Sequence, residues 1–113
     1  MSEARPRLKT EIVIAAQIRR AEAAGAFAHV ARKGDPDAGA IAVKVFIGRD
    51  EAGPAARLYI ESRDENGAFI WREPFNGPVA EEKVDGWLAK ERRIDPDLWI
   101  LEIEDKEGRS FAQ

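Results

Sequence analysis

The clearest pattern in the chain is the alternation of apolar and polar positions that is typical of half-buried strands. Ala40–Ile47 has β-branched residues at every second position, and Arg57–Arg63 alternates in the same way. The Asn-Gly pair at 66–67 is a strong tight-turn signal and precedes a returning strand over Ala68–Glu73. The turn-forming sequence GDPDAG separates Ala26–Lys33 from Ala40–Ile47. This arrangement predicts a hairpin between the two segments. Leu98–Glu104 is the last predicted strand.

Two stretches follow the helical period instead. The first lies between Thr10, a suitable N-cap, and Gly25, a suitable stop, although its β-branched run Ile12–Ile14 leaves a short strand as an alternative. The second runs from Pro78 to about Arg93, with acidic residues early and basic residues late, as the helix dipole favours.

These elements predict an α+β fold. Their order is α-β-β-β-β-α-β, and we expect a mostly antiparallel sheet with two helices packed on one face. A chain of 113 residues has the length of one domain. We expect a flexible N-terminal tail over residues 1–8 and a single domain over residues 9–113.

Composition narrows the chemistry. The chain has no Cys and one His, which excludes thiol nucleophiles, thiolate zinc sites and multi-His metal sites. By alternation, His29 shares one strand face with Phe27 and Ala31. It has no Ser in a GxSxG context and is interpreted as a structural or surface residue. No apolar run approaches the roughly 20 residues of a membrane span, so we expect no membrane association. The net charge of −3 argues against duplex DNA as a main partner. No cofactor is expected.

Two acidic turns are candidate metal sites. They have the same tripeptide, Asp-Pro-Asp, and would pool four carboxylates if they met in space: Asp35, Asp37, Asp95 and Asp97. The structural alternative is that Pro and Asp only supply turn geometry at both places.

The basic residues suggest a second kind of site. Six of them would form a local cationic patch for RNA or a nucleotide if they converged: Arg19, Arg20, Arg32, Lys33, Arg92 and Arg93. Tyr59, between Arg57 and Arg63 on one strand face, resembles a stacking surface. Cross-strand Arg–Glu pairs would explain the same pattern without a ligand.

Aromatic residues suggest a third kind of site. Phe75 lies in a loop between two prolines, where an exposed aromatic often marks a binding edge. Trp99, on the last predicted strand, would either anchor a protein partner or pack in the core.

Several segments resemble a known family. RRAEAAG, VARKGDPDAGAIAVKV, ARLY and ERRIDPDLWILEIEDKEGRSF are similar to the alphaproteobacterial domain of unknown function 1491, over roughly Leu8 to Phe111. The resemblance implies a single-domain bacterial protein in the cytoplasm. It implies no activity and no catalytic residue.

Three hypotheses follow, and whether the chain is an enzyme stays open. The first is a protein-interaction or accessory module, including a homodimer. The second is a small RNA or nucleotide binder that uses the basic residues. The third is a metal-dependent enzyme at the acidic turns.

Overall fold

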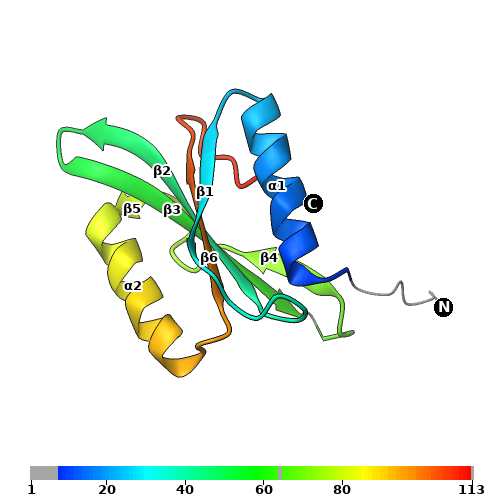
Figure 1. Ribbon diagram of the computed structural model, residues 1–113. Helices are drawn as coiled ribbons and strands as arrows, with labels where there is room; N and C mark the ends of the chain where they lie inside the picture. The colour runs from blue at the N-terminus through cyan, green and yellow to red at the C-terminus, as the bar shows by residue number, and fades with distance from the viewer. Residues whose placement is uncertain (1–7, 64, 113) are drawn as a thin grey trace.

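The computed structural model describes residues 8–63 and 65–112, which form two helices and a mixed sheet (Figure 1). The α-β-β-β-β-α-β order is confirmed, with one additional two-residue strand before the second helix. The elements are α1 (Thr10–Ala23), β1 (Phe27–Arg32), β2 (Ile41–Asp50), β3 (Gly53–Arg63), β4 (Phe69–Arg72), β5 (Val79–Ala80), α2 (Glu81–Ile94) and β6 (Trp99–Glu104). Seven of the eight residues of the predicted flexible tail lie outside the described residues.

The last strand lies inside the sheet rather than at its edge. The strand order is β1-β6-β2-β3-β4, with β5 paired to β3. β6 is antiparallel to β1 and parallel to β2, while the other pairs are antiparallel. The predicted hairpin between β1 and β2 is therefore wrong, because β6 separates them. The sheet is mostly antiparallel, as expected, with one parallel pair.

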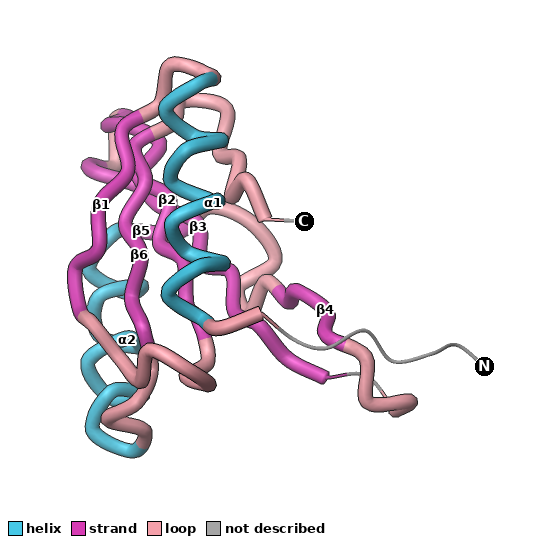
Figure 2. The backbone as a smooth tube through the Cα atoms, turned by 45° about the vertical axis from the view of Figure 1, so that its right-hand side comes forward, coloured by secondary structure: helices cyan, strands magenta, loops and turns pink. Residues whose placement is uncertain are grey.

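The two helices cover opposite faces of the sheet, which corrects the expectation that both pack on one face (Figures 1 and 2). Ile14 and Ala21 of α1 pack with alternate residues of β2 and β6, such as Val43 and Leu101. Ala42 of β2 and Ile100 of β6, which face the other way, pack with Leu58 of β3. Together with Val84 and Leu88 of α2 they form a second core. Strands whose two faces are both apolar thus allow a helix on each side.

The first turn of α1 is tied to the loop that follows β1. Lys9, not Thr10, is the N-cap residue, and Thr10 is the first residue of the helix. The Thr10 side chain is fully buried, and its Oγ1 donates a hydrogen bond of 2.8 Å to the carbonyl oxygen of Gly39. A residue predicted to begin a helix locally therefore makes a long-range tertiary contact.

The segment after β6 returns across α1 and β3. The Gln17 side chain donates to the Ser110 carbonyl at 2.7 Å, and Arg20 donates to the Phe111 carbonyl from two nitrogens at 2.6 and 2.9 Å. The Tyr59 hydroxyl donates to the Gly108 carbonyl at 2.8 Å. These bonds anchor the C-terminal segment to the face that α1 covers.

Neither α1 nor α2, the two helices among the described residues, has the length and apolar character of a membrane-spanning helix.

Candidate functional site

The two acidic turns do meet, but through their backbones. The Asp35 N–H donates to the Asp97 carbonyl at 3.0 Å, and the indole N–H of Trp99 donates to the Asp35 carbonyl at 2.7 Å. A side chain at Gly34 or Gly39 would collide with the Asp97 carbonyl oxygen. The Asp-Pro-Asp turns are therefore an interlocked structural element.

The carboxylates of these turns do not converge. Asp35 accepts the Ala38 N–H at 2.8 Å and Asp95 accepts the Asp97 N–H at 3.1 Å, both within their own turns. Asp37 lies 3.7 Å from the ammonium of Lys9. Within residues 8–63 and 65–112, no group of three His, Asp or Glu side chains could hold a metal ion. The contacts favour the structural interpretation of both turns.

The six basic residues fall into two groups on opposite sides of the sheet. Arg19 and Arg20 belong to α1, and the guanidinium of Arg20 is bound to the Phe111 carbonyl. The other four lie where β1 ends and α2 ends: Arg32, Lys33, Arg92 and Arg93. Arg92 donates to the Lys33 carbonyl at 3.1 Å and to the Pro96 carbonyl at 3.2 Å. A single patch of six cations does not form, while a group of four does.

The predicted stacking face on β3 is occupied by contacts within the chain. The Arg57 guanidinium makes two hydrogen bonds to the Glu73 carboxylate, at 2.6 and 2.7 Å. It also lies 5.3 Å from the centre of the Tyr59 ring. The hydrogen bonds to Glu73 raise the pKa of Arg57, and burial raises the pKa of Tyr59. Arg57 is thus paired with an acid of the chain itself, although Glu73 lies just after β4 and the pair is not a cross-strand pair of the kind expected.

The two aromatic anchor candidates have different surroundings. Trp99 is 3% exposed and packs in the core against α1, so its ring is not at the surface. Phe75 is half-buried against the second core, and the Lys83 ammonium lies 5.4 Å from the centre of its ring. The role of Phe75 as a binding residue stays a prediction, whereas Trp99 contributes packing and its bond to Asp35.

A buried cation lies at a position that the sequence pattern did not single out. Lys44 of β2 is 5% exposed, and its ammonium lies 2.8 Å from Glu81, 2.7 Å from Asp85 and 3.7 Å from Glu102. Burial alone lowers the pKa of Lys44, but the hydrogen bonds to Asp85 and Glu81 and the charge of Glu102 outweigh it, so the pKa lies above its ordinary value. The lysine joins α2 to β2 and β6. The alternation along this strand predicts that Lys44 and Val43 lie on opposite strand faces. No pattern in the neighbouring sequence indicates that Glu81, Asp85 and Glu102 lie around the ammonium group.

The edge of the sheet at β1 is free. No other described strand pairs with β1 on the side away from β6. The N–H groups of Trp99 and Asp105 donate toward β2, so the odd-numbered residues of β6 face β2 and the even-numbered ones face β1. Glu102 and Glu104 are opposite His29 and Phe27. The backbone N–H and C=O groups of Ala28 and Val30 therefore point outward.

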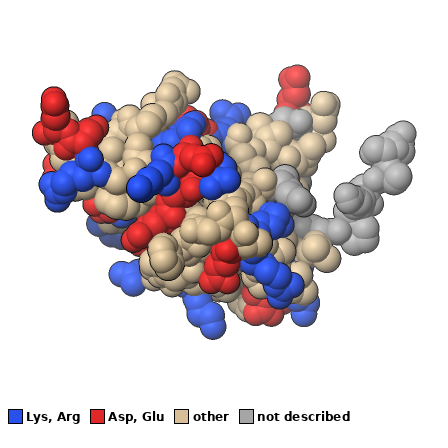
Figure 3. Space-filling model, turned by 90° about the horizontal axis from the view of Figure 1, so that it is seen from above, with Lys and Arg blue, Asp and Glu red and all other residues tan. Residues whose placement is uncertain are grey.

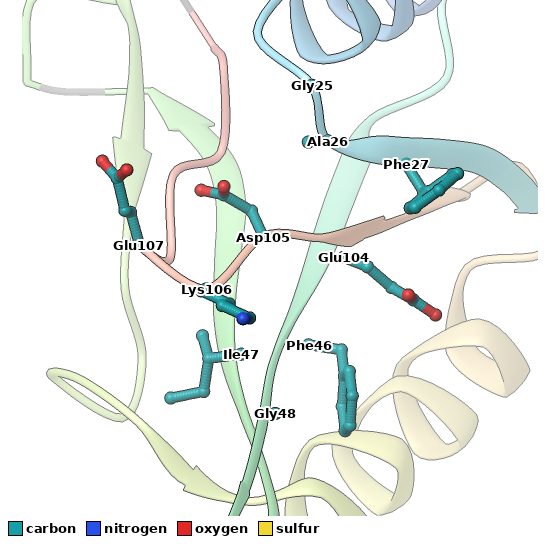
Figure 4. Close-up of a pocket in the computed structure, with 10 residues that line it drawn as sticks. All are labelled: Gly25, Ala26, Phe27, Phe46, Ile47, Gly48, Glu104, Asp105, Lys106 and Glu107. Atoms are coloured by element: carbon teal, nitrogen blue, oxygen red, sulfur yellow. The ribbon is translucent and has the colours of Figure 1, made fainter.

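Beside this edge, α2 leaves part of its own sheet face uncovered. Phe27, Glu104 and Phe46 lie in one row across β1, β6 and β2. Figure 4 shows the two rings and the Glu104 carboxylate on the same side of the sheet. Phe27 is 74% exposed, and the row borders a hollow of about 410 Å³. The other charged residues that line this hollow are Asp105, Lys106 and Glu107. None of the ion pairs found among the described residues includes Glu104. An aromatic ring beside a free carboxylate suits a cationic side chain.

The other end of the same edge is basic. Arg32, Arg92 and Arg93 line a hollow of about 490 Å³ beside Ala31 and Ile100. The acidic residues in that hollow, Asp85 and Glu102, are the ones that Lys44 contacts. β1 spans six residues, so roughly 20 Å separate its two ends. We call β1 with its acidic end (Phe27, Glu104) and its basic end (Arg32, Arg92, Arg93) the edge surface.

The charges at the end of the molecule where α1 meets β1 are mixed. Figure 3 shows Lys and Arg interspersed with Asp and Glu there, without a broad area of one sign. His29 is exposed, and its Nε2 lies 3.5 Å from the Glu102 carboxylate, as a surface histidine. Sequence parity already placed Phe27, His29 and Ala31 on one strand face. What it could not show is that α2 leaves the end of this face open.

Comparisons with known proteins agree on one family. The model of the protein family of unknown function DUF1491 matches residues 8–113. The crystal structure of a DUF1491 family protein from Caulobacter crescentus CB15 has a TM-score of 0.81 at 45% identity, covering 95% of this chain and 96% of that one. An NMR structure of a DUF1491 protein from the same organism has a TM-score of 0.78, also at 45% identity, with coverages of 94% and 93%.

A solution structure of a protein from A. tumefaciens is also similar. Its TM-score is 0.72 at 35% identity, with 95% of this chain and 93% of that chain covered. The comparison with curated proteins gives no match. Both organisms with solved structures are alphaproteobacteria, as the resemblance implied. The chain belongs to the DUF1491 family.

Proposed function

We propose that this chain is a protein-interaction module that binds an extended protein segment along the edge surface. The observation that carries the proposal is the outward direction of the Ala28 and Val30 backbone groups on an edge strand. An unpaired strand edge offers hydrogen bonds to another strand, and this is a recurrent mode of peptide recognition. The setting that we propose for this binding is the cytoplasm.

Side chains beside the edge supply selectivity. A bound strand would place a basic side chain against Phe27 and Glu104 and an acidic one against Arg32 and Arg93. Main-chain hydrogen bonds would give affinity, and these two contacts would set direction and register. Phe27 supports this role because a phenylalanine that is 74% exposed buries much apolar area when a partner covers it.

The basic end alone supports a second candidate, RNA or nucleotide binding. Arg32, Lys33, Arg92 and Arg93 lie close together, although Arg92 is engaged by backbone carbonyls. Four cations would give strongly salt-dependent binding. The experiment below separates this candidate from the first.

The test is capture from an alphaproteobacterial lysate, with and without nuclease, by the wild-type chain and by the Ala28→Pro variant. Proline at an outward-facing edge position removes one outward N–H and keeps the ladder to β6 intact. We expect proteins that the wild type retains after nuclease treatment and that the variant loses.

Ala28→Ser serves as the matched control, since it changes the same side chain and keeps the N–H. Equal thermal unfolding of the three proteins would show that the fold is intact. Retention of every bound protein by Ala28→Pro would contradict the proposal. Loss of all bound material on nuclease treatment would favour the nucleic-acid candidate.

A further inference from the structure

We propose that the segment bound at the edge surface is β1 of a second copy of this chain, paired antiparallel about a two-fold axis. The inference rests on the proposed function and names its partner. It is carried by the order of charged groups along the edge, with the Glu104 carboxylate where β1 begins and the guanidinium groups of Arg32 and Arg93 where β1 ends. In an antiparallel pair of identical edges, the acidic end of each copy meets the basic end of the other, so the surface is complementary to itself.

The backbone directions select the register. The outward groups belong to Ala28 and Val30, so these two residues must form the hydrogen-bonded pairs. If Ala28 lies opposite Val30 of the second copy, the reciprocal pair forms by symmetry. The axis then passes between the two His29 residues, which are opposite each other in a pair without hydrogen bonds. Four backbone hydrogen bonds result.

The same register keeps each side chain on its proper face. Ala28 and Val30 pack against the core beneath α1, so their pairs extend that core. Phe27 lies opposite Ala31 of the second copy, and both point toward the face that α2 covers in part. No charged side chain is placed toward the α1 core.

The charged ends are within reach of each other. β6 of one copy and β1 of the other are two strand spacings apart, about 10 Å. The long side chain of Arg32 from the second copy can cross the ring of Phe27 and reach the Glu104 carboxylate. A guanidinium over an aromatic ring and beside a carboxylate is favourable. Symmetry makes this contact twice.

An irregularity in β1 limits the pairing to this short stretch. The register of β1 against β6 shifts between Val30 and Arg32. Such a bulge interrupts an edge and prevents open-ended strand addition. The pairing closes as a dimer because each copy uses its β1 edge once about the two-fold axis. With only four backbone bonds, we expect a dimer that dissociates on dilution.

The first test is sedimentation velocity of the wild type between about 10 μM and 1 mM at low salt. We expect a concentration-dependent shift from monomer to dimer. Ala28→Pro should stay monomeric over the same range, and Ala28→Ser should follow the wild type. A wild type that is monomeric throughout would overturn the inference.

The second test exchanges the charges. Glu104→Arg and Arg32→Glu each put like charges together at both contacts, so each variant alone should dimerise at least about tenfold more weakly than the wild type. An equimolar mixture of the two variants restores an opposite-charge pair at both contacts. The mixture should therefore dimerise with an affinity within a few-fold of the wild type. A mixture that stays monomeric would overturn the proposed contact.

Failure of this inference differs from failure of the proposed function. If the wild type is monomeric but captures a protein that Ala28→Pro loses, the edge binds a different partner and only the second-copy inference falls. If the wild type neither dimerises nor captures anything that depends on Ala28, both fall.

Discussion

Gly34 and Gly39 make possible the contact that joins the two acidic turns. Both face the Asp97 carbonyl oxygen, and neither position has room for a side chain. That oxygen accepts the Asp35 N–H, while Trp99 donates to the Asp35 carbonyl from the other side. The two glycines therefore allow the loop after β1 to close over the residue that leads into β6.

We predict that Gly34→Ala lowers the free energy of unfolding by about 3 kcal/mol, because backbone atoms on both sides of the new methyl group must move. Gly86→Ala is the matched control. It lies inside α2 with open space around it, and the same substitution should stabilise the chain by roughly 0.5–1 kcal/mol. Urea unfolding of both variants measures the two effects. Equal effects at the two positions would contradict this account of the turns.

Asp105, just after β6, makes stability depend on pH. Arg109 donates to its carboxylate from two side-chain nitrogens, each at 2.9 Å, and from its backbone N–H at 2.8 Å. The side-chain hydrogen bonds from Arg109 hold the pKa of Asp105 below its ordinary value of 3.8, against the opposing effect of burial. Its contribution is therefore fully present above about pH 4 and is lost as pH falls through the lower, folded pKa.

We predict that the wild type loses more stability between pH 5 and about pH 2.5 than Asp105→Asn does, because the amide has no proton to gain. Urea unfolding at a series of pH values measures this difference. Glu82→Gln, at an exposed position on α2, is the control and should follow the wild type closely. Parallel curves for the wild type and Asp105→Asn would show that Asp105 does not cause the acid sensitivity.

At the scale of elements, the local sequence pattern predicted which strands form but not which strands pair with each other. The alternation over Ala40–Ile47 predicted β2, and Asn-Gly at 66–67 predicted the turn before β4; both are confirmed. The hairpin between β1 and β2 was wrong, because GDPDAG has the composition of a turn but serves as a connection around an inserted strand. Which strand enters that gap depends on residues nearly sixty positions further along the chain.

In the candidate site too, local features could be predicted from the sequence and tertiary features could not. Strand parity placed Phe27 and His29 on one face, and that is correct. Their exposure depends on where α2 packs, which no local pattern contains. Whether the two acidic turns are adjacent could not be predicted from the sequence, because their contact is made by backbone atoms, which the residue types do not indicate.

Lys44 connects three elements, and we predict that Lys44→Met lowers the free energy of unfolding by about 2 kcal/mol. The substitution leaves Glu81, Asp85 and Glu102 without their shared cation, and their partial exposure moderates the cost. Lys90→Met, at an exposed position on α2, should change it by no more than about 0.5 kcal/mol. Thermal or urea unfolding compares them. A Lys44→Met variant as stable as Lys90→Met would mean that the cluster does not join α2 to the sheet.

At the scale of the whole molecule, the two acidic turns are adjacent, but among residues 8–63 and 65–112 no three His, Asp or Glu side chains gather as metal ligands would. We predict that Mg²⁺, Mn²⁺ or Ca²⁺ at millimolar concentration leaves the melting temperature unchanged, since the carboxylates of Asp35 and Asp95 are used within their own turns. Differential scanning calorimetry with and without each ion measures this. An upward shift that disappears in Asp35→Asn or Asp97→Asn would reverse the conclusion.

The position of β6 between β1 and β2 has a consequence for the chain as it is made. β1 and β2 leave the ribosome well before β6, and at roughly 5–20 residues per second the delay amounts to several seconds. During that time each of the two strands exposes the edge that β6 will later cover. The nascent chain therefore has a strand without its partner, β1, and a sheet that ends at β2, and both can pair with other chains until Trp99–Glu104 has emerged.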